Sequence, residues 1–389
     1  MHAPTTNPID SRLAELLRIA VGVDTAMESP CTVEEWSAIY QRAKEHAITG
    51  LIYKAVSLLP NEQLPNADII GHLFSDAQYI HIQNVKVHSL CIKLQREFRK
   101  NGFQTAILKG AGNALLYRTI SNGQNATDDV GAYRQAGDVD IWLITNGCTS
   151  IAANRKAVIE HVRPYASSLE ARVHHVELLP IDGIPIEVHY LPMFFYSFRT
   201  QRRFERFCIQ QAQRQTSHQC GDLFVPTPDF NAVYQLSHIL RHLFEEGVGM
   251  KQIVDYYFVL LNLRNRADDG QSIDVAWEIE RLKLSPLASA TMYVLQEIFR
   301  LPKEYMICPP DEDKGKLLMA EVLRGGYMGL YDDRKSDWRL KGKTNMFLWK
   351  WRFNMRLWQL CPREMICGPL FRLWHYGWRR RNGYWVERN

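Results

Sequence analysis

The sequence predicts an α+β fold, in which a small mixed sheet is flanked by a helical N-terminal region and an all-helical C-terminal portion. Three observations support this class. Helical apolar spacing fills the first hundred residues, strand-like and helix-like segments then alternate, and helical patterns return after residue 226. The expected boundaries are 1–100 for the helical region, 101–225 for the α/β core, 226–337 for a helical domain and 338–389 for a basic, aromatic-rich segment.

Helices are expected throughout the N-terminal region. The apolar spacing of residues 11–25 predicts a short first helix. Thr32 and Glu35 form a capping-box pattern ahead of a second helix that ends near residue 47. Residues 66–101 predict a long helix with a broad apolar face, and we expect this region to pack on the sheet.

The core is expected to alternate strands with helices. Asp182-Gly183 is a two-residue hairpin signal, so the strand that contains Glu187 should return antiparallel to the one before it. The expected elements are a strand from 103, a short helix after Gly110, a strand around 138–143, a helix near 149–165 and strands at 171–179 and 184–190.

The C-terminal portion reads as a series of helices. Thr227-Pro228 predicts an N-cap followed by proline at the first helical position, and this helix should run to Glu246 and stop at Gly247. Further helices are expected at 250–263, 274–283 and 286–299.

Three carboxylates lie in two of the strand-like segments. Asp138 and Asp140 are two residues apart, so an extended strand turns both toward the same face. Glu187 follows 47 residues after Asp140, between β-branched neighbours. Carboxylate oxygens are the natural ligands of Mg²⁺, and a pair of such ions can clamp both oxygens of an in-line phosphoryl displacement. We therefore expect these acids to bind metal and to be catalytic.

A glycine turn precedes the acidic strand. An apolar run ends at Lys109-Gly110, and a helix-like segment follows. Glycine at such a turn allows a backbone to approach a phosphate, and the first turn of a helix offers free N–H donors.

In this order, the motifs resemble a known family. The matching segments are Leu108-Lys109-Gly110 with Leu116-Tyr117, Arg134 ahead of Gly137-Asp138-Val139-Asp140, Ile186-Glu187-Val188-His189, His238 with His242, and Asp255. They are similar to uncharacterised bacterial nucleotidyltransferases of the DNA polymerase β-like superfamily. The similarity is weak from about residue 35 to the C-terminus and specific only within 107–190.

The resemblance implies a nucleotidyltransferase core that transfers a nucleotidyl group from a nucleoside triphosphate to an unidentified acceptor hydroxyl, with Mg²⁺ (or Mn²⁺). It implies that Asp138 and Asp140 hold both metals and that Glu187 completes the site of the metal that activates the acceptor. The implied nucleotide-binding residues are Lys109, Gly110, Arg134, Gly137, His238 and His242.

Two features depart from the family pattern. Gly110 is followed by Ala111, where many superfamily members have serine or glycine. The stretch between Gly110 and Asp138 is also longer than usual, and it contains a polar, turn-rich segment at 121–131. This segment could be a lid or a tolerated insertion.

Plainer interpretations remain for several of these residues. The three acids could line a solvated strand face, Lys109 could pair with a local acid, and Arg134 could be a solvated loop arginine. His238 and His242 could be structural, as could His174, His175 and His189. A metalloprotease helix is excluded, because Ile239 occupies the position that needs glutamate.

Other enzyme classes lack their motifs. The chain has no Gly-x-x-x-x-Gly-Lys-Ser/Thr, no dinucleotide fingerprint and no Gly-x-Ser-x-Gly. Rival functions remain: a glycosyltransferase that uses Asp-x-Asp to hold a nucleotide-sugar, or a non-catalytic nucleotide-binding or membrane-surface scaffold.

The basic character belongs to one segment. Residues 338–389 contain 12 Lys+Arg against two acids and seven of the ten tryptophans, whereas the whole chain has a net charge of +5. This segment could pack on the acidic body, or contact a membrane surface or a protein partner. Sequence-specific nucleic-acid binding is not expected, because no reader motif is present.

A cytoplasmic location is expected. The N-terminus has no basic and apolar signal pattern, and no apolar run approaches the length of a membrane span. The eight cysteines are scattered without a Cys-x-x-Cys pair, which argues against a zinc ribbon or a disulfide framework.

Overall fold

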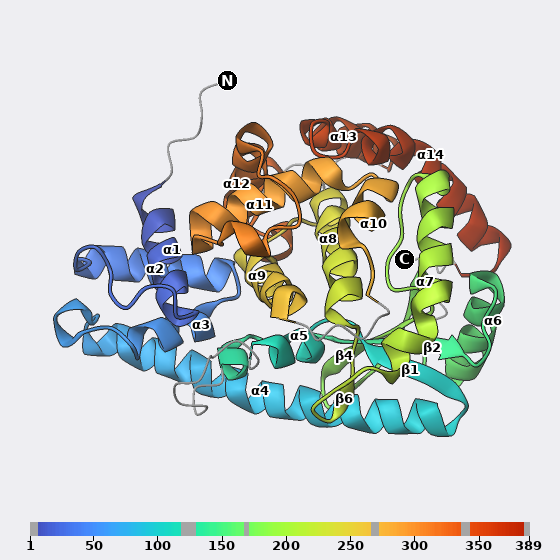
Figure 1. Ribbon diagram of the computed structural model, residues 1–389, viewed down its shortest axis with the longest axis horizontal. Coiled ribbons are helices and arrows are strands. Elements are labelled where there is room, and N and C mark those ends of the chain that lie inside the picture. Colours follow the sequence, from blue (N-terminus) through green and yellow to red (C-terminus); the bar gives the residue numbers. More distant parts are fainter. Residues whose placement is uncertain (1–6, 118–129, 167–170, 266–271, 336–342, 385–389) are drawn as a thin grey trace.

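The computed structural model describes residues 7–117, 130–166, 171–265, 272–335 and 343–384, without the side chains of 343–348 (Figure 1). The polar segment expected at 121–131 lies almost wholly outside the described residues, as do parts of the 338–389 segment. The described part has an α+β fold with a small mixed sheet and helical regions, in agreement with the sequence.

The N-terminal region forms the helices α1 (Pro8–Ala20), α2 (Val33–Glu45), α3 (Thr49–Val56) and α4 (Ala67–Lys100). The capping box of Thr32 and Glu35 is confirmed, and Asn66 caps the long helix α4. The first helix begins and ends earlier than the predicted 11–25. Asn7 caps it, Pro8 occupies its first turn, and Gly22 with a φ of +82° follows its end.

The described strands form a four-stranded sheet in the order β1-β2-β4-β3. The pairs β1/β2 and β3/β4 are antiparallel, and β2/β4 is parallel, so the sheet is mixed as predicted. The strands are β1 (Phe103–Ile107), β2 (Val139–Thr145), β3 (His175–Ile181) and β4 (Ile184–His189), with a separate small hairpin of β5 (Gln219–Cys220) and β6 (Leu223–Phe224).

The prediction of a strand at 171–179 was wrong at both ends. The Arg172 N–H donates to the carbonyl of His175, which makes a turn, and the strand therefore begins only at His175. Asp182 and Gly183 form the expected turn, with φ values of +51° and +77°.

The remaining helices are α5 (Ala111–Leu116), α6 (Ile151–Val162), α7 (Phe198–Ser217), α8 (Pro228–Glu245), α9 (Met250–Asn265), α10 (Val275–Arg281), α11 (Ser285–Phe299), α12 (Glu312–Gly325), α13 (Lys343–Asn354) and α14 (Pro362–Arg381).

Thr227 precedes α8 as expected, but its side chain does not cap the helix. The hydroxyl instead bonds to Gln215 and Asp229.

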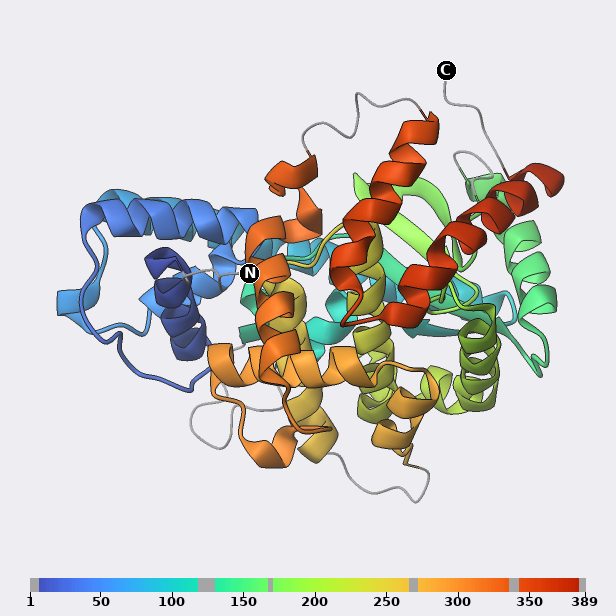
Figure 2. The same cartoon turned by 90° about the horizontal axis from the view of Figure 1, so that it is seen from above.

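Helix α4 extends from the N-terminal helices to the sheet, where it contacts β1 and β2 (Figure 1). Helices α8 and α9 pack together above the sheet. Helices α1–α3 lie at one end of the molecule and α14 lies toward the other, while α4 runs from one end toward the other (Figures 1 and 2). Within the described residues, none of the helices combines the length and the apolar character needed to span a bilayer.

Candidate functional site

The predicted acids meet on one face of the sheet. Asp140 on β2 is the register partner of Glu187 on the parallel strand β4, so their side chains lie next to each other on the same face. Glu187 is also opposite Glu177 on β3. Asp138 stands just before β2, two residues from Asp140. The row of carboxylates therefore crosses three strands.

Lys109 and Gly110 lie beside these acids. The Leu108 N–H donates to the carbonyl of Asp140 and extends the pairing of β1 with β2. The Lys109 ammonium then lies 3.2 Å from Asp140 Oδ1 and 3.7 Å from Asp138 Oδ2. Gly110 has a φ of +61°, and a Cβ there would lie 3.3 Å from the Asp138 carbonyl, so the turn favours glycine.

Histidines form a second row on the same face. His189 Nε2 lies 3.0 Å from Asp140 Oδ1 and 3.3 Å from Glu187 Oε2. His175 is the register partner of His189, and its Nδ1 lies 3.3 Å from the same Glu187 oxygen. His174 Nε2 is 3.1 Å from His175 Nδ1.

Burial and mutual charge set the protonation of this cluster. Burial and the charge of Asp138 raise the pKa of Asp140, Lys109 and His189 oppose this, and the resulting pKa is about 6. Burial would lower the pKa of Lys109, but the surrounding acids raise it well above its usual value. Burial also disfavours charged His189, yet its bonds to Asp140 and Glu187 raise its pKa to about 9. The acids thus face two cationic side chains.

The donor set suits a divalent cation. Asp140 Oδ2 is buried and has no hydrogen-bond partner among the described residues. Asp140, Glu187 and His189 each offer a ligand atom within 4.8 Å of the others. Within the described chain, Asp138 does not belong to such a group. An unpaired buried carboxylate oxygen is costly unless a cation or donor meets it, so the residues fit a metal such as Mg²⁺.

Arg134 is engaged elsewhere. Its Nε and Nη2 donate to the two carboxylate oxygens of Asp255 over 2.6 and 2.7 Å, and the Tyr117 hydroxyl donates to the same carboxylate over 2.8 Å. Arg134 is 5% exposed. The expected triphosphate arginine is therefore held in a buried ion pair between the segment before β2 and helix α9.

Helix α8 contributes the other two expected histidines. His238 and His242 contact each other through their Nε2 atoms at 2.8 Å, and His242 Nδ1 lies 3.0 Å from Glu246 Oε2. Burial lowers the pKa of His238 well below its usual value, and the charges of His242 and Lys109 lower it further. Gln235, one turn earlier, donates to the carbonyl of Leu108 over 3.4 Å, next to Lys109. This face of α8 therefore lies close to the acids.

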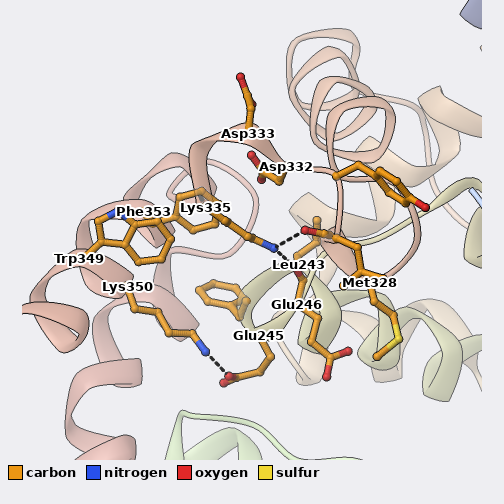
Figure 3. A pocket seen from close by; sticks show the side chains of 14 residues that line it. Leu243, Glu245, Glu246, Met328, Asp332, Asp333, Lys335, Trp349, Lys350 and Phe353 are labelled. Atoms are coloured by element: carbon orange, nitrogen blue, oxygen red, sulfur yellow. Dashed lines mark hydrogen bonds and ion pairs between the residues drawn. The ribbon is translucent and has the colours of Figure 1, made fainter. Parts of the chain in front are cut away.

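A cavity of about 540 Å³ opens at the end of α8 (Figure 3). Glu246, which binds His242, is part of its wall. Lys350 pairs with Glu245, and Lys335 donates to the backbone carbonyl of Glu246, so segments before and within α13 close this side. The cavity thus connects the α8 histidines with the C-terminal segment.

Gly110 and Arg134 line a second cavity of about 210 Å³. Its opposite wall comes from α4 and includes Asn84. The Asn84 amide donates to the carbonyls of Ala132 and Arg134 and accepts from the Ala136 N–H, so it holds the chain that leads to Gly137 and Asp138. Gly137 itself is exposed.

Several site residues were missed from the sequence. For His174, His175 and His189 a structural role was left open beside a functional one, and Gln235 and Asn84 were not singled out. The spacing of Glu187 and His189 places both on one face of a strand, and this signal could have identified His189. Asn84 left no such signal, because its partners lie about 50 residues away.

Comparison with known proteins agrees with this geometry. A search of curated proteins found no match, and a search of solved structures found none either. A family model described as "Uncharacterised nucleotidyltransferase" matches residues 32–300, which include the sheet, the acids and helices α8 and α9. Because this match covers more than half of the chain, the protein belongs to the uncharacterised nucleotidyltransferase family.

Proposed function

We propose that this protein is a metal-dependent nucleotidyltransferase of the DNA polymerase β-like superfamily, which moves a nucleoside monophosphate from an NTP to an acceptor hydroxyl. The pairing of Asp140 with Glu187, with one carboxylate oxygen of Asp140 buried and unbonded among the described residues, carries this proposal. Family membership supports the same chemistry.

Asp138, Asp140 and Glu187 would hold Mg²⁺ or Mn²⁺. The bound ions would neutralise phosphate charge and favour ionisation of the acceptor hydroxyl. The acceptor oxygen forms a bond to the α-phosphorus, the bond to pyrophosphate breaks, and the hydroxyl proton leaves toward Glu187. Lys109 and His189 balance the charge of the acids, and burial strengthens every charge interaction at this face.

The nucleotide would lie between the Gly110 turn and helix α8. The Gly110 N–H would hold a phosphate of the leaving pyrophosphate, near Lys109 and Gly137. His238 and His242 would face the nucleotide from α8. Arg134 would act through its ion pair with Asp255, which orders the chain ahead of Asp138. These roles rest on the short distances between Lys109 and the acids and on the hydrogen bond that Gln235 of α8 donates to the carbonyl of Leu108.

Titration calorimetry with each of the four NTPs and Mg²⁺ tests the proposal. We expect metal-dependent binding of the donor by the wild type, weakened at least about tenfold in the Asp138→Ala/Asp140→Ala variant because charge neutralisation is lost. The matched control is Glu160→Ala/Glu280→Ala, which removes two exposed acids outside the site. Thermal unfolding of each variant shows whether the fold persists. If the wild type binds none of the NTPs, the proposal is wrong.

The rival functions make different predictions for Glu187→Gln. A glycosyltransferase that holds a nucleotide-sugar through Asp-x-Asp would retain transfer, whereas nucleotidyl transfer should fall sharply. A non-catalytic module would be favoured by acids more than about 8 Å apart, too far to share ions. The ligand atoms of Asp140 and Glu187 lie within 4.8 Å.

We also propose that helix α14 meets an anionic membrane surface. Ile366, Leu370 and Leu373 recur at helical spacing and are 56%, 64% and 62% exposed. Arg379, Arg380 and Arg381 follow at the end of the helix. An apolar helix face with adjacent basic residues matches the chemistry of such a surface.

A further inference from the structure

The imidazole rings of His174, His175 and His189 lie together beside the acids, at the end of the β3/β4 hairpin that is opposite its turn. His175 and His189 face each other across the two strands, and His174 immediately precedes β3. Their exposed fractions are 6% for His174, 5% for His175 and 2% for His189. Nucleotidyl transfer through the carboxylates assigns no role to His174 or His175.

Two of these rings contact one carboxylate oxygen, and the third contacts one of the two. Glu187 Oε2 lies 3.3 Å from both His175 Nδ1 and His189 Nε2, and His174 Nε2 lies 3.1 Å from His175 Nδ1. The three histidines offer nitrogens that all lie within 4.8 Å of one another. Ligand atoms around a tetrahedral ion with bonds of about 2.1 Å lie about 3.4 Å apart, so this spacing resembles a coordination shell.

The inner nitrogens, His174 Nε2, His175 Nδ1 and His189 Nε2, face one another and the acids. The outer nitrogens, His174 Nδ1, His175 Nε2 and His189 Nδ1, are buried and have no hydrogen-bond partner among the described residues. An ion would bind the inner nitrogens and leave each outer nitrogen as an N–H group. On the outer side of His175, Glu177 Oε1 lies 3.9 Å from Nε2, where a carboxylate can orient a ligating imidazole.

The donor types select the ion. Mg²⁺ prefers oxygen ligands and gains little from imidazole. Imidazole nitrogens with one carboxylate are ligands of Zn²⁺ and the neighbouring divalent transition metals. We propose that His174, His175, His189 and Glu187 form a binding site for a divalent transition-metal ion, with Zn²⁺ the best match. The site shares Glu187 with the proposed Mg²⁺ site and takes His189 from beside Asp140. Binding of the ion is measured without nucleotide, so its failure is distinguishable from a failure of nucleotidyl transfer.

Titration of the tag-free, full-length protein with Co²⁺, a spectroscopic substitute for Zn²⁺, tests the site. We expect one equivalent to bind with a visible absorption band that Zn²⁺ abolishes and excess Mg²⁺ leaves unchanged. The His174→Ala/His175→Ala variant should bind on the order of 100-fold more weakly, since even outer-shell changes can cost that much. The matched control, His72→Ala/His81→Ala, removes two exposed histidines of α4 and should bind like the wild type.

A second measurement does not depend on the folding of a variant. X-ray absorption at the zinc edge of the wild-type complex should show imidazole scattering from three histidines. A shell of oxygens alone would overturn the proposal, as would equal Co²⁺ affinity in the wild type and a folded His174→Ala/His175→Ala variant. Displacement of Co²⁺ by Mg²⁺ would also contradict it.

Discussion

His46 illustrates how a single buried residue ties stability to pH. It follows α2, and its Nδ1 accepts a hydrogen bond from the Met250 N–H at the start of α9 over 3.3 Å. Its side chain is fully buried. Burial, together with the charge of Arg42, lowers the pKa of His46 to about 3. The folded protein therefore keeps this ring neutral through the mildly acidic range.

The unfolded chain protonates His46 near its ordinary pKa of about 6.5, so it takes up the proton first as the pH falls. The contribution of His46 is full above that pH and declines below it. Between pH 7.5 and 5.5 we expect this group to remove about 1.4 kcal/mol from the free energy of unfolding. Urea unfolding of wild type and His46→Asn, which retains an acceptor, should show a shallower pH dependence in the variant. The exposed His81→Asn should leave the slope unchanged, and equal slopes in all three would refute the assignment.

At the scale of elements, one carboxylate attaches α14 to the body. Glu364 is buried, accepts the backbone N–H groups of Tyr196 and Ser197 over 2.6 and 3.0 Å, and pairs with Arg241 of α8 at 2.8 Å. The Arg241 guanidinium lies 3.8 Å from the centre of the Tyr196 ring. Phe371, two turns later, packs on the aromatic rings of Phe194 and Tyr196.

Glu364→Ala should therefore destabilise the protein by about 3–5 kcal/mol, because it leaves a buried guanidinium without its partner. Urea denaturation measures this loss, and limited proteolysis should show faster cleavage within 343–381. Arg363→Ala, at the neighbouring half-buried position, is the control and should change stability by no more than about 0.5 kcal/mol. A similar effect of both substitutions would mean that the ion pair does not anchor the helix.

Across the whole molecule, charge and exposed apolar surface are unevenly distributed. The segment 338–389 contains 12 of the Lys and Arg residues, and its helix α14 lies toward one end of the molecule (Figure 2). Glu364 and Phe371 lie on the side of α14 that is buried against the rest of the protein. The segment therefore packs on the protein itself, which was one of the alternatives expected for it. The opposite side of α14 remains apolar and exposed. The segment can thus pack on the body with one face and meet a membrane surface with the other.

Sedimentation with anionic vesicles tests this surface. We expect the wild type to bind and Ile366→Ser/Leu370→Ser/Leu373→Ser to lose at least about tenfold in partitioning, since full burial of even one such side chain contributes roughly 1.5–3 kcal/mol. High salt should weaken binding of the wild type, because surface charge attraction is screened. The control Phe74→Ser/Ile82→Ser/Val85→Ser removes exposed apolar residues from α4 and should bind like the wild type. Absence of vesicle binding by the wild type would argue against a membrane partner.

The sequence by itself determined many of the elements and the strands that contain the acids, but it did not predict α3, α7 or α12. Capping residues and apolar periodicity act locally, so α2 and α4 could be predicted closely. The two-residue alternation of a strand placed Asp138 and Asp140 on one face, and a hairpin signal at Asp182-Gly183 predicted the return of β4 toward the acids. The metal-binding and catalytic roles of these acids stay predictions.

Only the tertiary structure decided which side chains meet. A two-residue turn at Asp182-Gly183 without irregularity would place Leu178 opposite Glu187, but a register shift between Leu178 and Ile181 places Glu177 there and His175 opposite His189. A shift of one residue exchanges the two faces of a strand, and no local pattern reveals it. Likewise, Arg134 pairs with Asp255, which is 121 residues later in the sequence. A buried guanidinium requires a charged partner, and only tertiary packing determines which carboxylate that partner is.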